Sequence, residues 1–134
     1  SGLPSATDYQ AIPFVIFSDP EMASVGLTKD AAANQGIEVV TARFPFQANG
    51  RALSLNKAEG FVHIVADKET QHVLGVQIVG PEASTMISEA ALAIEMGTTL
   101  EDLSLTIHPH PTLSETLAEA AEVALGHGIH LLSK

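Results

Sequence analysis

The chain has 134 residues, with six basic and sixteen acidic side chains, a net charge of −10 and no cysteine. A chain of this length is typical of one domain that buries about two-thirds of its surface. The acidic excess argues against nucleic acid or an anionic membrane as a partner, and it favours a basic partner or simple solubility. Without cysteine, this chain has neither a disulfide framework nor a redox-active cysteine pair.

The first half of the chain is predicted to contain short strands and one helix. Residues 1–10 are rich in small and polar side chains, and we expect a linker or an expression remnant there, before a domain that spans 11–134. Apolar runs predict strands at 14–17, 23–27 and 37–44. Thr28 can cap a helix that ends at Gly36, and the Asn49–Gly50 pair predicts a tight turn.

The second half is predicted to hold a hairpin followed by helices. Residues 61–66 and 73–79 are apolar runs separated by a polar connection, which is typical of a β-hairpin. The pattern then predicts a long helix at 82–96, a short one that begins with a Thr99–Asp102 capping box, and a last one at 113–125. Together these elements predict an α+β fold, an antiparallel sheet of about four to five strands with helices packed on one face.

The last predicted helix, 113–125, is apolar around nearly its whole circumference. Such a helix is normally buried on nearly all sides, and a small domain offers few such places. We therefore expect the helices at 82–96 and 113–125 to lie at or near an interface with a second copy of the chain, with Ala121 among the contacts. The alternative is a helix fully enclosed within one subunit.

The segment 106–115 concentrates ionisable and stiff residues, because two histidines alternate with two prolines. Thr112 and Glu115 have the spacing of a capping box, so Glu115 is in one interpretation only a helix cap. In another, Glu115 accepts a hydrogen bond from one ring nitrogen of His110 and leaves the other nitrogen free as a general base. In a third, His108 and His110 bind a metal, although no further ligand has a usual spacing. The residues alone leave all three open.

The segment 108–115, His-Pro-His-Pro-Thr-Leu-Ser-Glu, resembles the His-x-His-Pro-Thr-x-x-Glu signature of dihydrolipoyl dehydrogenases, in the FAD-dependent pyridine nucleotide-disulphide oxidoreductases. Segments 12–28, 44–53 and 75–80 resemble the same family in the same order. The resemblance extends from about residue 8 to residue 131. It implies that the chain is the C-terminal interface domain of such an enzyme, where two identical subunits meet.

The resemblance also implies roles for particular residues. His110 is expected to reach the partner subunit's site and to accept the proton of a dihydrolipoyl thiol as it attacks a disulfide, with its ring oriented by Glu115. His110 and Pro111 are expected near the partner subunit's flavin, joined by a cis peptide bond. FAD, NAD and the redox-active cysteines would belong to the N-terminal part of such an enzyme.

Cofactor binding is not expected of this chain alone. No glycine-rich dinucleotide-binding loop is present, so the isolated chain is predicted to bind neither FAD nor NAD tightly and to be inactive. Three alternatives stay open: a dimeric docking module without chemistry, the same domain of another disulphide reductase of the family, and a metal-binding domain.

A further partner follows from the resemblance. Dihydrolipoyl dehydrogenases work in 2-oxo acid dehydrogenase complexes such as the pyruvate dehydrogenase complex, and in some of them a small basic subunit-binding domain of the dihydrolipoyl acyltransferase docks across the two-fold axis. By position, Asp8, Tyr9 and Glu95 are the expected contacts, and the acidic charge agrees. Exposed acids that only keep the protein soluble are the alternative. The family implies a cytoplasmic location, and no apolar run is long enough to cross a bilayer.

Overall fold

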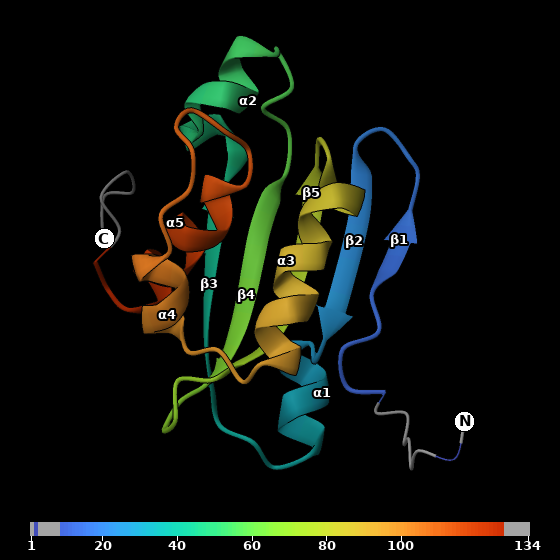
Figure 1. Cartoon of the computed structure of the whole chain (residues 1–134), viewed down its shortest axis with the longest axis vertical. Coiled ribbons are helices and arrows are strands. Elements are labelled where there is room, and N and C mark those ends of the chain that lie inside the picture. Colours follow the sequence, from blue (N-terminus) through green and yellow to red (C-terminus); the bar gives the residue numbers. More distant parts are fainter. Residues whose placement is uncertain (1, 3–8, 128–134) are drawn as a thin grey trace.

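An antiparallel sheet of five strands forms the centre of the molecule (Figure 1). The computed structural model describes residue 2 and residues 9–127. The strands are β1 (Phe14–Ile16), β2 (Glu21–Gly26), β3 (Val39–Pro45), β4 (Phe61–Asp67) and β5 (Val73–Gly80). Their order across the sheet is β1-β2-β5-β4-β3, and each neighbouring pair is antiparallel. The predicted hairpin is confirmed as β4 and β5, which lie between β2 and β3.

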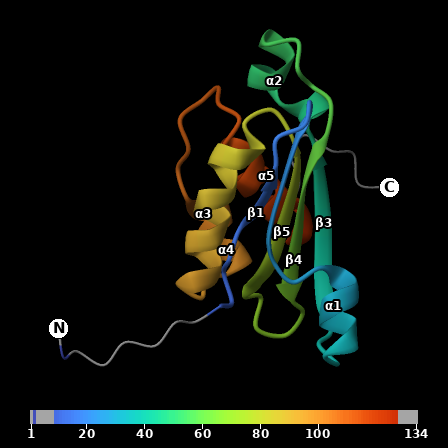
Figure 2. The same cartoon turned by 90° about the vertical axis from the view of Figure 1, so that its right-hand side faces the viewer.

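Three helices cover one face of this sheet (Figure 2). They are α3 (Ala83–Glu95), α4 (Leu100–Leu105) and α5 (Glu115–Ala124). α3 packs on β2 and β5, whereas α5 packs on β3 and β4. Two short helices, α1 (Lys29–Asn34) and α2 (Gly50–Ser54), lie toward opposite ends of the sheet, and a turn of 3-10 helix, η1 (Phe46–Ala48), precedes α2. The predicted α+β class is confirmed. In the described part of the chain, no helix has the length and apolar character needed to span a membrane.

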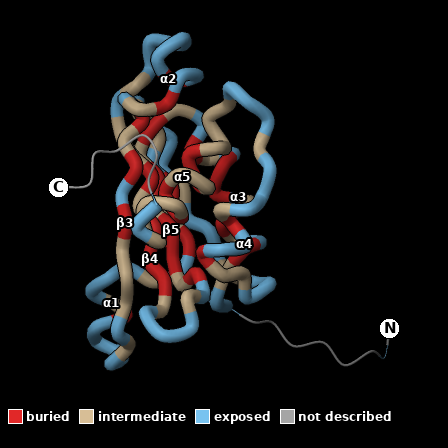
Figure 3. The backbone as a smooth tube through the Cα atoms, turned by 90° about the vertical axis from the view of Figure 1, so that its left-hand side faces the viewer, coloured by how far each residue is buried: buried red, intermediate tan, exposed pale blue. Residues whose placement is uncertain are grey.

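The core lies between the sheet and the covering helices (Figure 3). Strand alternation places every second side chain on the helical side, so Val62 and Ile64 of β4 stand opposite Ile78 and Val76 of β5, and all four are fully buried. Burying one such side chain contributes roughly 1.5–3 kcal/mol. From the helical side the core is completed by Met86, Ile87, Ala90, Leu117, Ala120 and Ala121.

Ala121 corrects the sequence-based expectation for the last helix. It lies on the inner side of α5 with Thr116, Leu117 and Ala120, and its exposed fraction is 0% in the single subunit. A second copy cannot contact a side chain that the subunit itself encloses, so the predicted intersubunit contact of Ala121 is wrong. The large exposed apolar side chains on the helical side are Leu92, Met96, Leu105 and Ile107.

Local capping patterns were confirmed at two helices and missed at a third. Thr28 accepts a hydrogen bond from the backbone of α1, and Thr99 with Asp102 forms the predicted capping box of α4. The predicted tight turn at Asn49–Gly50 is wrong, because Asn49 is the N-cap of α2 and its side-chain oxygen accepts from the N–H of Ala52.

Candidate active site

The two histidines and two prolines lie in the connection from α4 to α5, here called the His-Pro loop (Thr106–Ser114), on the outer side of the helical layer (Figure 2). Within the described structure, residues 107–113 donate no backbone–backbone hydrogen bond. Two of them are prolines, which have no N–H to donate. Side-chain contacts therefore hold this loop. The peptide bond between His110 and Pro111 is cis, as expected from the resemblance.

His110 pairs with the carboxylate at the start of α5. Its Nδ1 lies 2.9 Å from Oε2 of Glu115. An ionised carboxylate only accepts hydrogen bonds, so Nδ1 donates and the neutral ring keeps its lone pair on Nε2. The His110 side chain is 80% exposed, and Nε2 has no hydrogen-bond partner among the described residues. The ring therefore has one nitrogen exposed that could accept a proton.

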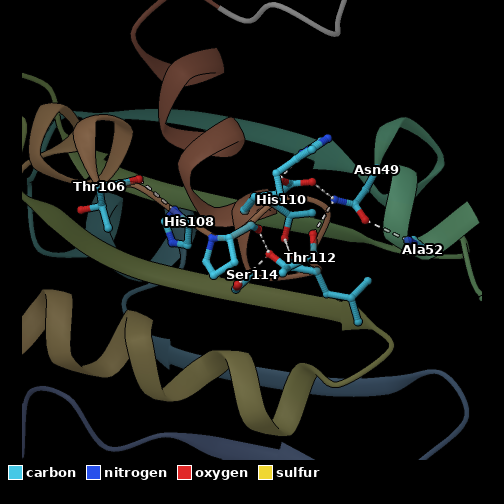
Figure 4. A network of polar contacts seen from close by, with 11 residues as sticks. Asn49, Ala52, Thr106, His108, His110, Thr112 and Ser114 are labelled. Atoms are coloured by element: carbon cyan, nitrogen blue, oxygen red, sulfur yellow. Dashed lines mark hydrogen bonds and ion pairs between the residues drawn. The ribbon is translucent and has the colours of Figure 1, made fainter. Parts of the chain in front are cut away.

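Glu115 is itself held from the other side by Asn49, which Figure 4 shows beside the His-Pro loop. The Glu115 side chain is only 17% exposed, and its Oε1 lies 3.1 Å from Nδ2 of Asn49. The same Nδ2 donates to the carbonyl oxygen of Thr112 at 3.0 Å, while Oδ1 accepts from Ala52. Asn49 is 2% exposed, so these three bonds satisfy a buried amide. Sequence reasoning missed this residue, because its only local signal was that of a turn.

The capping box predicted from Thr112 and Glu115 is wrong. α5 begins at Glu115 with Ser114 as its N-cap, and no side chain caps it. The Thr112 hydroxyl donates instead to the carbonyl oxygen of Pro109 at 2.7 Å, which leaves its oxygen to accept from Ser114 at 3.1 Å. Because the carboxylate of Glu115 is engaged by His110 and Asn49, it serves the loop and not the helix terminus.

His108 forms a second histidine–carboxylate pair in different surroundings. Its Nδ1 lies 3.0 Å from the carbonyl oxygen of Thr106, and its Nε2 lies 2.7 Å from Oε1 of Glu89 on α3. The His108 side chain is only 8% exposed. Both ring nitrogens are therefore occupied, which leaves none for an incoming metal ion. Across residues 9–127, no three side chains of the metal-ligating types come together.

The predicted partner-binding residues are partly described. Tyr9 and Glu95 are exposed, and Tyr9 lines the same hollow as Ile94, the neighbour of Glu95 on α3. Asp8 lies outside the described residues. Pro111, predicted to face the partner subunit's flavin, is exposed on the His-Pro loop.

Sequence comparison identifies the family of the chain. The family model described as the pyridine nucleotide-disulphide oxidoreductase dimerisation domain matches residues 12–121. The chain belongs to this family. This dimerisation domain is 58% identical over 134 residues to the dihydrolipoyl dehydrogenases of Halobacterium salinarum and Geobacillus stearothermophilus. Each match covers the whole of this chain but only 28% of the relative's length.

Solved structures show the same fold for this dimerisation domain. LpdA from Mycobacterium tuberculosis superposes with a TM-score of 0.83 at 29% identity, covering 89% of this chain and 26% of that one. The HOCl-induced flavoprotein disulfide reductase RclA from Escherichia coli gives 0.82 at 25% identity, covering 85% of this chain and 26% of that one. The domain thus corresponds to about a quarter of each of these larger proteins.

Proposed function

We propose that this domain is the C-terminal interface domain of a dihydrolipoyl dehydrogenase, where it mediates homodimerisation and contributes His110 and Glu115 as the acid/base pair for oxidation of dihydrolipoamide. One observation carries the proposal. Glu115 binds Nδ1 of His110 and thereby leaves Nε2 as an exposed base. Relatives named dihydrolipoyl dehydrogenase, 54–58% identical over nearly the whole domain, support the substrate class.

The chemistry needs a base at this point because a thiolate, and not a thiol, attacks a disulfide. Nε2 of His110 takes the thiol proton, and the sulfur forms a bond to one sulfur of the disulfide while the other sulfur leaves as a thiolate. Glu115 keeps the ring in the required tautomer and stabilises the imidazolium that results. The proton can then be returned to a leaving thiolate or to water, so the base is regenerated.

The rest of the reaction would depend on parts that this domain lacks. With no cysteine in the chain, the disulfide has to come from elsewhere in the enzyme. We assign the cysteine pair and the sites for FAD and NAD to the remaining part of the longer protein, and bound FAD would supply electron transfer from the reduced disulfide to NAD. His110 and Pro111 would then lie near the partner subunit's flavin. The isolated domain is expected to be inactive.

Exposed apolar side chains support a homodimer formed through the helical side. Leu92 on α3 and Met96 at its C-cap stand exposed there, as do Leu105 at the end of α4 and Ile107 in the His-Pro loop, and Ile107 is 96% exposed. Apolar side chains of this size that a second copy could cover favour such an interface. A second copy that covered Ile107 would also approach His110, three residues further along. This gives a structural reason for His110 to serve the partner's site and not its own.

The base assignment is tested by His110→Gln in a full-length enzyme that carries this domain. Turnover of dihydrolipoamide should fall by about two to four orders of magnitude, the usual contribution of a positioned acid/base. Reduction of an artificial electron acceptor by NADH should remain, because it requires no thiol proton transfer. Near-normal turnover of dihydrolipoamide would refute the base and favour a docking module without chemistry.

Contribution across the interface is tested by hybrid dimers. One subunit carries His110→Gln, and the other has its cysteine pair replaced. Each parent dimer is inactive, but a hybrid has one site that combines intact cysteines with an intact histidine, so random mixing should restore about a quarter of the wild-type activity. No restoration would mean that His110 serves its own subunit.

Dimerisation is tested by sedimentation equilibrium of the isolated chain. We expect a dimer at micromolar concentration and a weaker one with Leu92→Asp, since the substitution would bury an unpaired charge. Leu53→Asp is the matched control, because Leu53 is similarly exposed but lies on α2 at the end of the sheet. A clean monomer of the wild-type chain up to about 100 micromolar would contradict the interface.

A docking role for the exposed end of α3 is favoured by the hollow that Tyr9 and Ile94 share. We propose that Asp8, Tyr9 and Glu95 contact the basic subunit-binding domain of a dihydrolipoyl acyltransferase, as in a pyruvate dehydrogenase complex. Calorimetry should find one such domain per dimer, since a ligand across the two-fold axis excludes its own symmetry mate. Two equal sites, or an affinity unchanged between about 50 and 500 mM salt, would rule this out.

A further inference from the structure

We propose that His108 and Glu89 are a positioning pair, which fixes the His-Pro loop to α3 and thereby holds His110 at its working position. The inference rests on the proposed role of His110 as the base. It concerns a second histidine in the same loop, whose 2.7 Å contact with Glu89 reaches an element that the loop does not join.

Few other polar contacts hold the loop. In the described structure, residues 107–113 donate no backbone–backbone hydrogen bond, so side chains supply the attachments. His110 binds Glu115 of α5, the helix that the loop itself enters. Only two polar contacts tie the loop to other elements among the described residues: Asn49 holds Thr112 from the start of α2, and Glu89 holds His108 from α3.

The pair connects two parts of the helical layer. α3 packs on β2 and β5, and α5 packs on β3 and β4, so the two helices cover different halves of the sheet. The bond between His108 and Glu89 links the loop that enters α5 to α3. The His108 side chain is 8% exposed, and a charge-assisted bond that is shielded from water is stronger than an exposed one.

Both ring nitrogens of His108 are engaged, so neither is free to accept a proton from a substrate. A carbonyl oxygen only accepts, so Nδ1 donates to Thr106, and Nε2 is engaged by the carboxylate of Glu89. Pro109 follows directly and has a fixed φ angle, while the residue before a proline is itself restricted. A displacement of His108 is therefore passed along a stiff backbone to His110.

Kinetics of the full-length enzyme can separate positioning from general stability. Glu89→Ala should lower kcat for dihydrolipoamide by about tenfold, because a misplacement of about 1 Å is costly in a positioned site. KM should change little, and NADH-driven dye reduction should stay at the wild-type level. Glu89→Gln, which keeps an acceptor oxygen of the same reach, should recover at least half of kcat. The control is Glu101→Ala, an exposed acidic residue on α4 with no such contact.

Proton NMR of the isolated chain gives a readout that does not depend on activity. The shielded ring N–H of His108 should exchange slowly with water in the wild-type chain and rapidly in Glu89→Ala. His108→Gln repeats the kinetic experiment from the other side of the pair, should Glu89→Ala fail to fold. Unchanged kcat in the variants, or a parallel loss of dye reduction, overturns the positioning role. Normal turnover in His110→Gln would instead refute the base itself, whatever the NMR result.

Discussion

The His-Pro loop carries two histidine–glutamate pairs that have the same chemistry and opposite surroundings. The ring of His110 is 80% exposed and uses one nitrogen, whereas the ring of His108 is 8% exposed and uses both. A general base needs a free nitrogen within reach of a substrate, but a structural attachment needs none. The surroundings, and not the residue types, therefore distinguish the proposed roles of two histidines that are separated by a single proline.

The two carboxylates differ as well. Glu115 is 17% exposed, and its Oε1 accepts a hydrogen bond from Asn49 while its Oε2 binds His110. Contacts at both oxygens therefore fix the orientation of this carboxylate. Glu89 is 32% exposed and binds only His108 in the described structure. A carboxylate fixed at both oxygens can orient a ring that is otherwise free to turn, which is what the exposed histidine requires. The buried ring is oriented by its own two hydrogen bonds.

Of the changes that distinguish the two pairs, Glu115→Ala in a full-length enzyme is expected to lower turnover the most. Turnover of dihydrolipoamide should fall by about ten- to a hundredfold, less than for His110→Gln, because the substitution removes the group that orients the base but keeps the base. Steady-state kinetics with dihydrolipoamide provides the measurement. A loss equal to that of His110→Gln would mean that Glu115 does more than orient the ring, and a full rate would mean that it does nothing.

Chemical modification should separate the two rings in the isolated chain. A reagent that acylates histidine should modify His110 at least about tenfold faster than His108. The buried ring of His108 reacts only when the loop opens locally. Peptide mapping by mass spectrometry as a function of time measures both rates in one sample. In Glu89→Ala the rate at His108 should rise toward that at His110. Equal rates in the wild-type chain would contradict the described burial of His108.

Asn49→Ala should have an intermediate effect, on both stability and turnover, through the His110–Glu115 pair. The change leaves the part-buried oxygens of Glu115 and Thr112 without their donor and the buried N–H of Ala52 without its acceptor. An unpaired buried group costs about 1–3 kcal/mol. Denaturant unfolding should therefore show a clear loss of stability, and turnover in the full-length enzyme should fall several-fold. Ser54→Ala is a control on the same helix, since the Ser54 hydroxyl binds only a backbone carbonyl of α2. Unchanged turnover would show that Glu115 orients His110 unaided.

The smallest effect on stability is expected from Glu21→Gln, which acts on α3, the helix that carries Glu89 of the His108–Glu89 pair. The carboxylate of Glu21 accepts from the N–H of Ser84 in the first turn of that helix, whose own N-cap supplies no side-chain bond. Hydrogen bonds from Ser84 lower the pKa of Glu21 below its usual value of 4.5. Removing a charge at a helix N-terminus typically costs about 0.3–1 kcal/mol.

The pH dependence of this last effect has a definite sign. A carboxyl group with a lowered pKa in the folded state stabilises the fold above its unfolded pKa, and this contribution is lost as pH falls through the folded value. The stability difference between wild type and Glu21→Gln should be greatest near neutral pH and should shrink below the usual value of 4.5. Thermal unfolding across that range measures it. A difference that grew on acidification would contradict the assigned contact.

The sequence by itself determined the features that depend on near neighbours along the chain. The hairpin of β4 and β5 follows from two apolar runs and a polar connection, and the caps at Thr28 and Thr99 involve partners three residues away. Such features are decided by local conformation and alternation, so they could be predicted with their boundaries nearly correct. The pairing of His110 with Glu115 was predictable as one of several interpretations, because the two lie only five positions apart.

Only the tertiary structure decided which polar groups far apart in sequence would meet. Asn49 looked like a turn residue, but its partners Thr112 and Glu115 lie 63 and 66 residues away. The same long-range contact removed Glu115 from the capping box that its spacing predicted. Glu89 and His108 are 19 residues apart, and no local pattern connects them. A sequence can present two histidines on a stiff loop, but burial and the distant carboxylates determine which of them keeps a free nitrogen.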